Sequence, residues 1–183
     1  MTPFRVLEAD PPWSFSDSLP GKTRGAARNY PCMRVDAIRR LVLPPLHDDC
    51  VLFLWRVSAM QEEALSVVRA WGFTPKSEIV WVKTTRPSED VGATRLAFGM
   101  GHYVRASHET CLIATRGRAK PMHHSQRSVF FAERGRHSAK PESFYDLVEA
   151  MYAGPRVRLF ARSERPGWTS IGVSLGSTLQ VAS

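Results

Sequence analysis

The sequence predicts a single α/β domain built as a three-layer sandwich. Short apolar runs typical of strands alternate with segments whose apolar residues recur at helical spacing, and this alternation favours a sheet covered by helices. A chain of 183 residues is long enough for one domain with a real core and too short for two of usual size. Hydrophobic content of 43% and charged content of 23% are ordinary for a globular protein.

In the first half of the chain, the pattern predicts a strand over 5–10, a long loop over 13–31, a short helix over 35–43 and a buried apolar strand over 51–56. Ser58 with Gln61 resembles a capping box, which predicts a helix that Gly72 ends. A strand over 79–83 follows. Residues 84–100 lack periodicity and are predicted to form a loop.

In the second half, strands are predicted over 109–115 and 128–133. Pro141 can begin a helix, whose inner face would carry four apolar residues, namely Phe144, Leu147, Val148 and Met151. The last clear strand covers 157–161. We therefore expect one domain over 1–175, followed by a flexible tail over 176–183.

Several classes of protein are disfavoured by composition. No apolar run approaches ~18 residues, and residues 1–9 lack the basic and apolar stretches of a signal peptide. Three widely spaced cysteines, Cys32, Cys50 and Cys111, indicate reduced thiols and hence a cytoplasmic protein. The adjacent His123 and His124 lack the spaced partners of a zinc site, so we expect no metal.

The basic charge makes a polyanion the first partner to consider. The formal charge is +8 with a pI near 9.9, and 20 of the 25 basic residues are arginines, which suit phosphates. A GC-rich genome would also enrich arginine without any selection for binding. Placement favours nucleic acid, because basic residues cluster in two loops, namely Lys22, Arg24 and Arg28 in one, and Arg116, Arg118, Lys120 and Arg127 in the other.

The strongest motif is Asp10-Pro11-Pro12-Trp13, which follows the first strand. The prolines restrict the backbone, so the Asp10 carboxylate is presented at the carboxyl end of a strand, where open α/β sheets bind ligands. The Asp10 side chain can accept hydrogen bonds from an amine, and so can the carbonyls of Asp10 and Pro11, which we expect to be unused within the turn. Trp13 offers a face for stacking. A planar base with an exocyclic amine fits both features. The alternative is a proline-rich turn with a structural aromatic residue.

The motif resembles the signature of the MT-A70 family of N6-adenine methyltransferases. Further stretches resemble the same family in the same order: Tyr30 and Met33, Leu52-Phe53-Leu54-Trp55, Trp71-Gly72-Phe73, Val80-Trp81-Val82-Lys83, Gly101-His102-Tyr103, His108-Glu109, Arg116-Gly117, His137-Ser138 with Lys140-Pro141, Leu159-Phe160-Ala161-Arg162, and Pro166-Gly167-Trp168. The resemblance implies a Rossmann-like fold of the S-adenosylmethionine-dependent methyltransferase type, with that molecule as cofactor.

The resemblance also implies roles for single residues. Asp10, Pro11, Pro12 and Trp13 would be catalytic. Residues implied in donor binding are Asp10, Lys140, Phe160, Arg162, Trp168 and Ser174. Residues implied in substrate binding are Tyr30, Glu109 and the loop cations Lys22, Arg24 and Arg28. For Phe160, Tyr30 and Glu109, ordinary packing or a solvated strand end is the alternative, and His102 and His108 are expected to be structural.

Two positions depart from the family pattern. The family commonly has a Gly-Asn-Gln type triplet where this chain has Gly172-Val173-Ser174, and an acidic residue where it has Arg158. The loss of a hydrogen bond to the donor would cost ~0.5–1.5 kcal/mol. Either other residues complete the pocket or the chain has lost activity.

We therefore expect an enzyme that methylates the N6 amine of adenine in DNA, in the cytoplasm of a bacterial or phage-infected cell. The alternatives are methylation of RNA and a silent subunit that binds nucleic acid. Residues 84–100 are the expected surface for a homodimer or heterodimer, and no membrane partner is expected.

Overall fold

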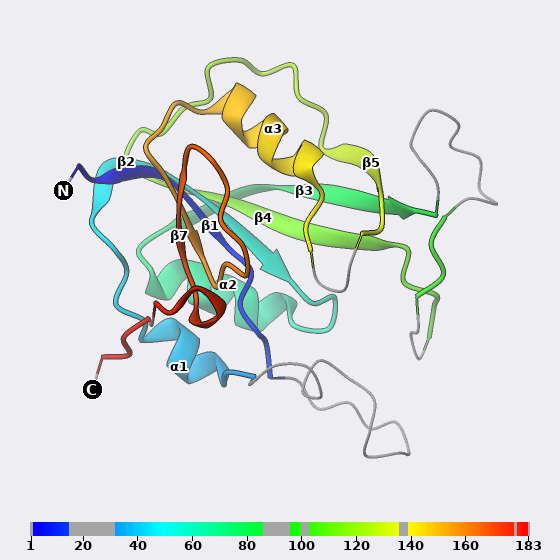
Figure 1. The fold of residues 1–183 in the computed structure, drawn as a ribbon, viewed down its shortest axis with the longest axis horizontal. Helices are drawn as coiled ribbons and strands as arrows, with labels where there is room; N and C mark the ends of the chain where they lie inside the picture. Colours follow the sequence, from blue (N-terminus) through cyan, green and yellow to red (C-terminus); the bar gives the residue numbers. More distant parts are fainter. Residues whose placement is uncertain are drawn as a thin grey trace.

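A seven-stranded sheet forms the centre of the protein (Figure 1). The computed structural model describes residues 2–14, 32–85, 96–99, 103–135, 139–177 and 179–182. The strands lie in the order β5-β3-β4-β2-β1-β6-β7. Their bounds are β1 Phe4–Ala9, β2 Leu46–Arg56, β3 Thr74–Thr84, β4 His108–Arg116, β5 Val129–Glu133, β6 Arg156–Leu159 and β7 Trp168–Ile171.

The first strand lies inside the sheet, between two parallel neighbours. β1 pairs with β2 on one side, with Ala9 opposite Leu54, and with β6 on the other, with Ala9 opposite Leu159. The chain leaves β1 toward β2 and returns to its other edge only at β6. This reversal of direction is a topological switch point, the place where open α/β sheets bind ligands.

One described strand, β4, runs antiparallel to its neighbours β2 and β3. Its first residues therefore lie beside the last residues of β2, with Thr110 opposite Arg56. The consequence is that the amino end of β4 reaches the same edge of the sheet as the carboxyl ends of the other strands.

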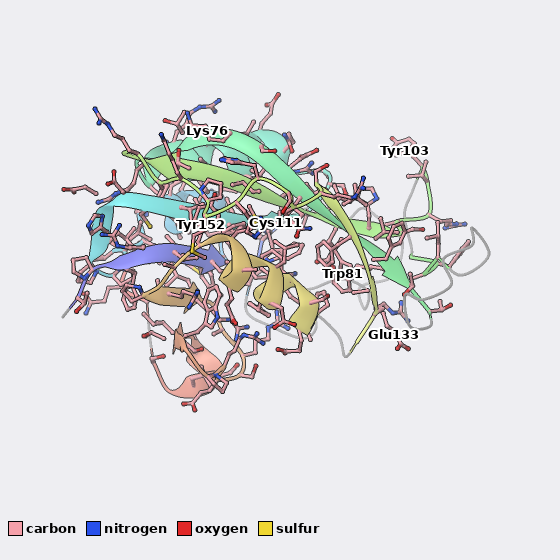
Figure 2. All side chains as sticks on the ribbon, turned by 90° about the horizontal axis from the view of Figure 1, so that it is seen from above. Lys76, Trp81, Tyr103, Cys111, Glu133 and Tyr152 are labelled. Atoms are coloured by element: carbon pink, nitrogen blue, oxygen red, sulfur yellow. The ribbon has the colours of Figure 1, made fainter. Side chains whose placement is uncertain are left out.

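Helices cover both faces of the sheet (Figure 1). α1 (Val35–Arg39) and α2 (Gln61–Ala70) pack on one face, over a core that includes Leu52 and Leu54. α3 (Glu142–Met151) packs on the other, over Phe53 and Trp81. Figure 2 looks onto this second face, with Trp81, Cys111 and Tyr152 labelled around α3. The predicted three-layer α/β fold is confirmed.

Some predicted boundaries were wrong. The N-cap of α2 is Met60, with no side-chain hydrogen bond, so Ser58 and Gln61 form no capping box. β2 and β3 begin about five residues before the predicted strands, because their outer halves are less apolar than their centres. β7 was not predicted, since its four residues, Trp168–Ile171, have no alternating pattern. No helix in the described parts of the chain is long and apolar enough to cross a membrane.

The C-terminal segment is attached to the domain. Residues Leu41 and Val181 form an antiparallel bridge, the Val42 amide donates to the Gln180 carbonyl, and the Ala182 amide donates to the Arg40 carbonyl. Residues 179–182 therefore do not run free, as the predicted tail would. A short 3-10 helix, η3 (Val173–Leu175), lies between β7 and this segment.

Candidate active site

Asp10 lies immediately after β1, at the switch point of the sheet. The preceding β1 residues alternate between faces, and Leu7 and Ala9 pack toward α1 and α2. Asp10, at the opposite parity, lies on the α3 side, and about a quarter of its side chain remains exposed. The β-run and the prolines thus place one carboxylate at the carboxyl edge of the sheet, as predicted.

The proline turn is held by hydrogen bonds on both sides. The Trp13 amide donates to the Pro11 carbonyl at 2.8 Å, and the Met33 amide donates to the Pro12 carbonyl at 2.7 Å. We had expected the Pro11 carbonyl to be unused within the turn, and this expectation was wrong. A carbonyl oxygen has two lone pairs, so Pro11 can still accept one further hydrogen bond.

Trp13 stabilises the turn, and its ring has no exposed face for stacking. Its side chain is 4% exposed within the core under α1 and α2, and its indole N–H donates to the Trp55 carbonyl at 3.0 Å. The predicted exposed stacking surface is therefore wrong for this structure. The indole instead fixes the turn to the end of β2, which holds Asp10 in place.

Lys140 connects two carboxylates at this edge. Its Nζ lies 2.9 Å from Asp10 Oδ2 and 2.8 Å from Glu109 Oε2. The side chain is 7% exposed and its ammonium lies over the Trp55 ring, 4.7 Å from the centroid. Pro141 is the N-cap of α3, so the backbone that delivers Lys140 is restrained on one side.

Glu109 lies at the site because β4 runs antiparallel to its neighbours. It is the second residue of β4, and the reversal brings that end of the strand beside Asp10. Its other oxygen, Oε1, lies 2.5 Å from Nζ of Lys83, near the end of β3. Our sequence reasoning missed Lys83 as a site residue, although Val80-Trp81-Val82-Lys83 had been matched to the family pattern. The signal was a lysine at the carboxyl end of an otherwise apolar strand.

The four side chains therefore alternate in charge, in the order Asp10, Lys140, Glu109 and Lys83. Burial acts to lower the pKa of Lys140, but Asp10 and Glu109 outweigh it and raise that pKa above its ordinary value. Burial acts to raise the pKa of Glu109, but Lys140 and Lys83 hold it below its ordinary value. At neutral pH Lys140 and Glu109 are both ionised.

A second pair of charged residues lies on β1 and β6, inside the sheet next to Asp10. Glu8 of β1 is 2% exposed and Arg158 of β6 is 9% exposed, and Oε2 of Glu8 lies 3.6 Å from Nε of Arg158. Arg158 was singled out as a departure from the family pattern, but its partner Glu8 was missed. An acid within an apolar strand, opposite a basic residue in another strand, was the available signal.

The residues assigned to the donor side lie in two different places. Phe160 and Arg162 follow β6 at the carboxyl edge, and Phe160 has a φ of +61°, in the left-handed region that non-glycine residues rarely adopt. Ser174 is exposed in η3, which follows β7 at the same edge, beside Val173 at 77% exposure. These positions are compatible with a binding wall next to Asp10.

Trp168 does not belong to that wall. It is the first residue of β7 and lies opposite Arg156, the first residue of β6, so it sits at the start of these parallel strands. Its indole N–H donates to Glu149 of α3 at 2.7 Å, and its side chain is 8% exposed. The prediction of a donor-side role was wrong, because the match in sequence gave no information on the strand end.

The structure describes only one of the two predicted groups of basic loop residues. Lys22, Arg24, Arg28 and Tyr30 lie outside the described residues, so their predicted roles remain predictions. Arg116 ends β4 opposite Cys50, toward the amino end of β2, and lies 3.9 Å from Asp48. Arg118 follows it, with its amide bound to Asp49. This second basic group therefore begins at the edge of the sheet away from Asp10.

Three further expectations concern the 84–100 segment, His102 and metal binding. The 84–100 segment, expected to mediate dimers, is described only at 84–85 and 96–99, and His102 lies outside the described residues. Tyr103 nearby is fully exposed and projects from the end of the molecule (Figure 2). Among the described residues, no group of three or more His, Cys, Asp or Glu side chains is arranged to hold a metal ion.

Comparison with known proteins agrees with this geometry. The family model MT-A70 matches residues 4–174. The chain is 31% identical over 176 residues to the human N(6)-adenosine-methyltransferase catalytic subunit METTL3, covering 94% of this chain and 28% of that protein. It is 32% identical over 177 residues to the Arabidopsis thaliana N(6)-adenosine-methyltransferase MT-A70-like, covering 94% and 24%. A Mycoplasma protein, type II methyltransferase M.MunI, is 24% identical over 193 residues, covering 94% and 78%. The chain thus spans under a third of the length of these two eukaryotic relatives.

Proposed function

The chain belongs to the MT-A70 family, and from that premise we propose that it transfers a methyl group from S-adenosylmethionine to the N6 amine of adenine in DNA. Methyltransferases of this family use S-adenosylmethionine as the methyl donor. The observation that carries the proposal is the Asp10 carboxylate, which is fixed by Lys140 at the switch point of the sheet.

The chemistry of the edge fits this donor. S-adenosylmethionine has an amino-acid end with an ammonium and a carboxylate, and a sulfonium that supplies an electrophilic methyl group. Asp10 can accept a hydrogen bond from an ammonium or an amine. Lys140 has three N–H donors, of which Asp10 and Glu109 take two, so one remains for a carboxylate. Ser174 and Arg162, at the same edge, supply further donors.

Asp10 would act on the base. The N6 amine of adenine is a weak nucleophile, because its lone pair is delocalised into the ring. A carboxylate that accepts one of its two hydrogens turns that lone pair outward and stabilises the positive charge that develops as the N–C bond forms. The S–C bond of the donor would break as the N–C bond forms, with the neutral thioether as the leaving group, and the methylated amine would then release one proton to water. Lys140 holds the Asp10 oxygen in position, so the acceptor needs little reorganisation.

DNA is proposed as the polymer because one relative, M.MunI, is a type II methyltransferase and is matched over 94% of this chain. A duplex substrate would have its adenine flipped out of the stack. Methylation of RNA is the second candidate, favoured by the higher identity to the N(6)-adenosine-methyltransferases.

The test offers both polymers to the purified protein. We would incubate it with labelled donor and either DNA or RNA, and quantify N6-methyladenine by mass spectrometry of nucleosides. We expect product from DNA with the parent protein and none with Asp10→Ala. Asp36→Ala, at an exposed aspartate of α1, is the matched control and should retain parental activity. Product from RNA alone would overturn the choice of DNA, and equal activity in Asp10→Ala would overturn the role of Asp10.

A silent subunit is the alternative from another class, favoured by Val173 and Arg158 in place of the usual polar and acidic residues. Calorimetry of donor binding separates the two. A protein that binds DNA and shows no heat with S-adenosylmethionine at millimolar concentration would be such a subunit.

A further inference from the structure

The pair of Glu8 and Arg158 is unusual for the interior of a sheet. The two residues lie directly opposite each other in the parallel pairing of β1 and β6. Arg158 donates from one terminal nitrogen to the Tyr145 hydroxyl at 2.7 Å and from the other to the Ser163 carbonyl at 3.4 Å, and its guanidinium stacks on the Tyr145 ring. Both terminal nitrogens of the arginine therefore have partners in α3 and in the loop after β6, whereas its buried Nε has no hydrogen-bond partner among the described residues.

Glu8 is satisfied much less well. Its Oε2 lies 3.6 Å from Arg158 Nε, longer than a hydrogen bond, and its Oε1 is buried with no hydrogen-bond partner among the described residues. Leaving a buried carboxylate oxygen unpaired is costly, so a purely structural pair would be expected to close this distance. Arg158 therefore compensates the buried negative charge of Glu8 only in part.

That charge faces the candidate site. Asp10 follows β1 directly and is two residues from Glu8 along an extended backbone, so both side chains lie on the same face of the sheet. The groups that act on Glu8 are Arg158 from β6, Asp10 from the turn after β1 and Lys140 from the segment before α3. Tyr145 of α3 and Cys111 of β4 also feel its charge, and both have raised pKa values through burial and remain neutral.

The charges of the whole cluster balance when Glu8 is ionised. Three carboxylates, Glu8, Asp10 and Glu109, then stand against three cations, Arg158, Lys140 and Lys83. With Glu8 neutral, the cluster has an excess of one positive charge. Burial raises the pKa of Glu8 to about 7, against the opposing effect of Arg158, so both states are accessible near neutral pH.

We propose that Glu8 is a specificity-determining residue, whose buried charge makes the site favour the cationic methyl donor over the product, which has lost that charge. This inference rests on the proposed function. S-adenosylmethionine and S-adenosylhomocysteine differ by one methyl group and by the positive charge on sulfur. A negative charge on Glu8 attracts the sulfonium and leaves the neutral thioether almost unaffected. Its loss leaves Arg158 uncompensated and repels the donor alone.

The experiment measures both ligands by calorimetry at about pH 8.5, where Glu8 is ionised. We would compare the parent protein with Glu8→Gln, and take the ratio of the donor affinity to the product affinity. One buried charge acting through partly polar protein predicts a fall of roughly threefold to tenfold in this ratio for Glu8→Gln. The double variant Glu8→Gln with Arg158→Gln restores the charge balance and should return the ratio to within about twofold of the parent.

A second arm varies the pH and compares the parent protein with Glu8→Gln. In the parent protein, lowering the pH to about 6 protonates Glu8 and should lower the same ratio. The ammonium groups of the ligands titrate as well, but they do so in Glu8→Gln too, so the difference between the two proteins isolates Glu8. Circular dichroism checks that the variants are folded.

The outcomes are distinct. Equal losses for both ligands in Glu8→Gln, or a pH dependence that is the same in both proteins, would show that Glu8 is only structural and would overturn the inference. If the parent protein binds neither ligand, the proposed function fails instead.

Discussion

Replacing Lys140 with methionine tests the charge arrangement of the candidate site directly. Methionine keeps an unbranched apolar chain that can pack on Trp55, but it removes the ammonium between Asp10 and Glu109. Two carboxylates that both contact one Nζ in the parent protein would then lose this shared cation, and only Glu109 would keep another, Lys83. We expect the variant to be folded but destabilised, and to bind the donor weakly.

The expected loss can be bounded from the geometry. Removing one partner of a buried ion pair costs about 3–5 kcal/mol, because the remaining charge is buried without compensation. Asp10 and Glu109 each keep about a quarter of their side-chain surface exposed, so solvent screens part of this cost. We expect a loss in the free energy of unfolding of about 3 kcal/mol near pH 8.

The loss should depend on pH in a definite direction. In the parent protein the pKa of Lys140 is raised, so its contribution to stability is present at every pH below the lysine's unfolded value. The pKa of Glu109 is lowered, so its contribution is present above about pH 4.5 and is lost as the pH falls. Without Lys140, the pKa of Glu109 should rise relative to the parent protein, because only Lys83 is left to oppose burial, and protonation then relieves the repulsion in acid. The difference between parent and variant should therefore shrink to about 1 kcal/mol near pH 5.

Urea unfolding followed by circular dichroism at several pH values between about 5 and 8 measures this difference. Lys76→Met, at an exposed lysine of β3, is the matched control and should change stability by less than about 0.5 kcal/mol at every pH. A loss in Lys140→Met that is the same at pH 5 and pH 8 would refute the reasoning, because removal of packing alone has no such pH dependence.

Two further predictions concern the backbone around the site. Trp13→Phe removes the indole N–H that donates to the Trp55 carbonyl, and it should cost about 1–2 kcal/mol in urea unfolding and lower the methylation rate by loosening the turn that holds Asp10. Wild-type stability in this variant would show that the turn needs no such anchor. Gly172→Ala places a Cβ against the Ala161 carbonyl, so the strands β6 and β7 must separate at the carboxyl edge. We expect weaker donor binding by calorimetry and a loss of about 1–3 kcal/mol, whereas alanine at the open position Gly72 should cost only its backbone strain of about 1 kcal/mol.

The layers of the fold could be predicted from the sequence because the signals were local. The apolar run over 51–56 and the helical spacing in 61–70 each determine a buried element by themselves. β7 could not be found in this way, since it consists of four residues whose strand character depends on pairing with β6. The order of the strands in the sheet likewise depends on pairing between segments distant in sequence, and no residue in β4 indicates that this strand runs antiparallel.

The same distinction applies to the site. Asp10 was predictable because its own neighbours, two prolines and an apolar run, determine its geometry. Glu109 and Lys140 were matched by family resemblance, but their mutual contact depends on the reversal of β4. Lys83 and Glu8 were missed, because each gains its role from a partner at least 26 residues away. Trp168 was misplaced, since a motif does not state which end of a strand it occupies.

The pairing of β1 has a consequence for how this protein is made. β1 is complete when residue 9 has been synthesised, yet β6, which covers one of its edges, begins at residue 156. Until then a flat, apolar strand has an open row of hydrogen-bonding groups along that edge, which other chains can extend. Contacts so distant in sequence also slow folding. A nascent chain arrested before residue 156 would thus carry Asp10 on a strand still free to aggregate, and the candidate site would form only after β6 has been synthesised.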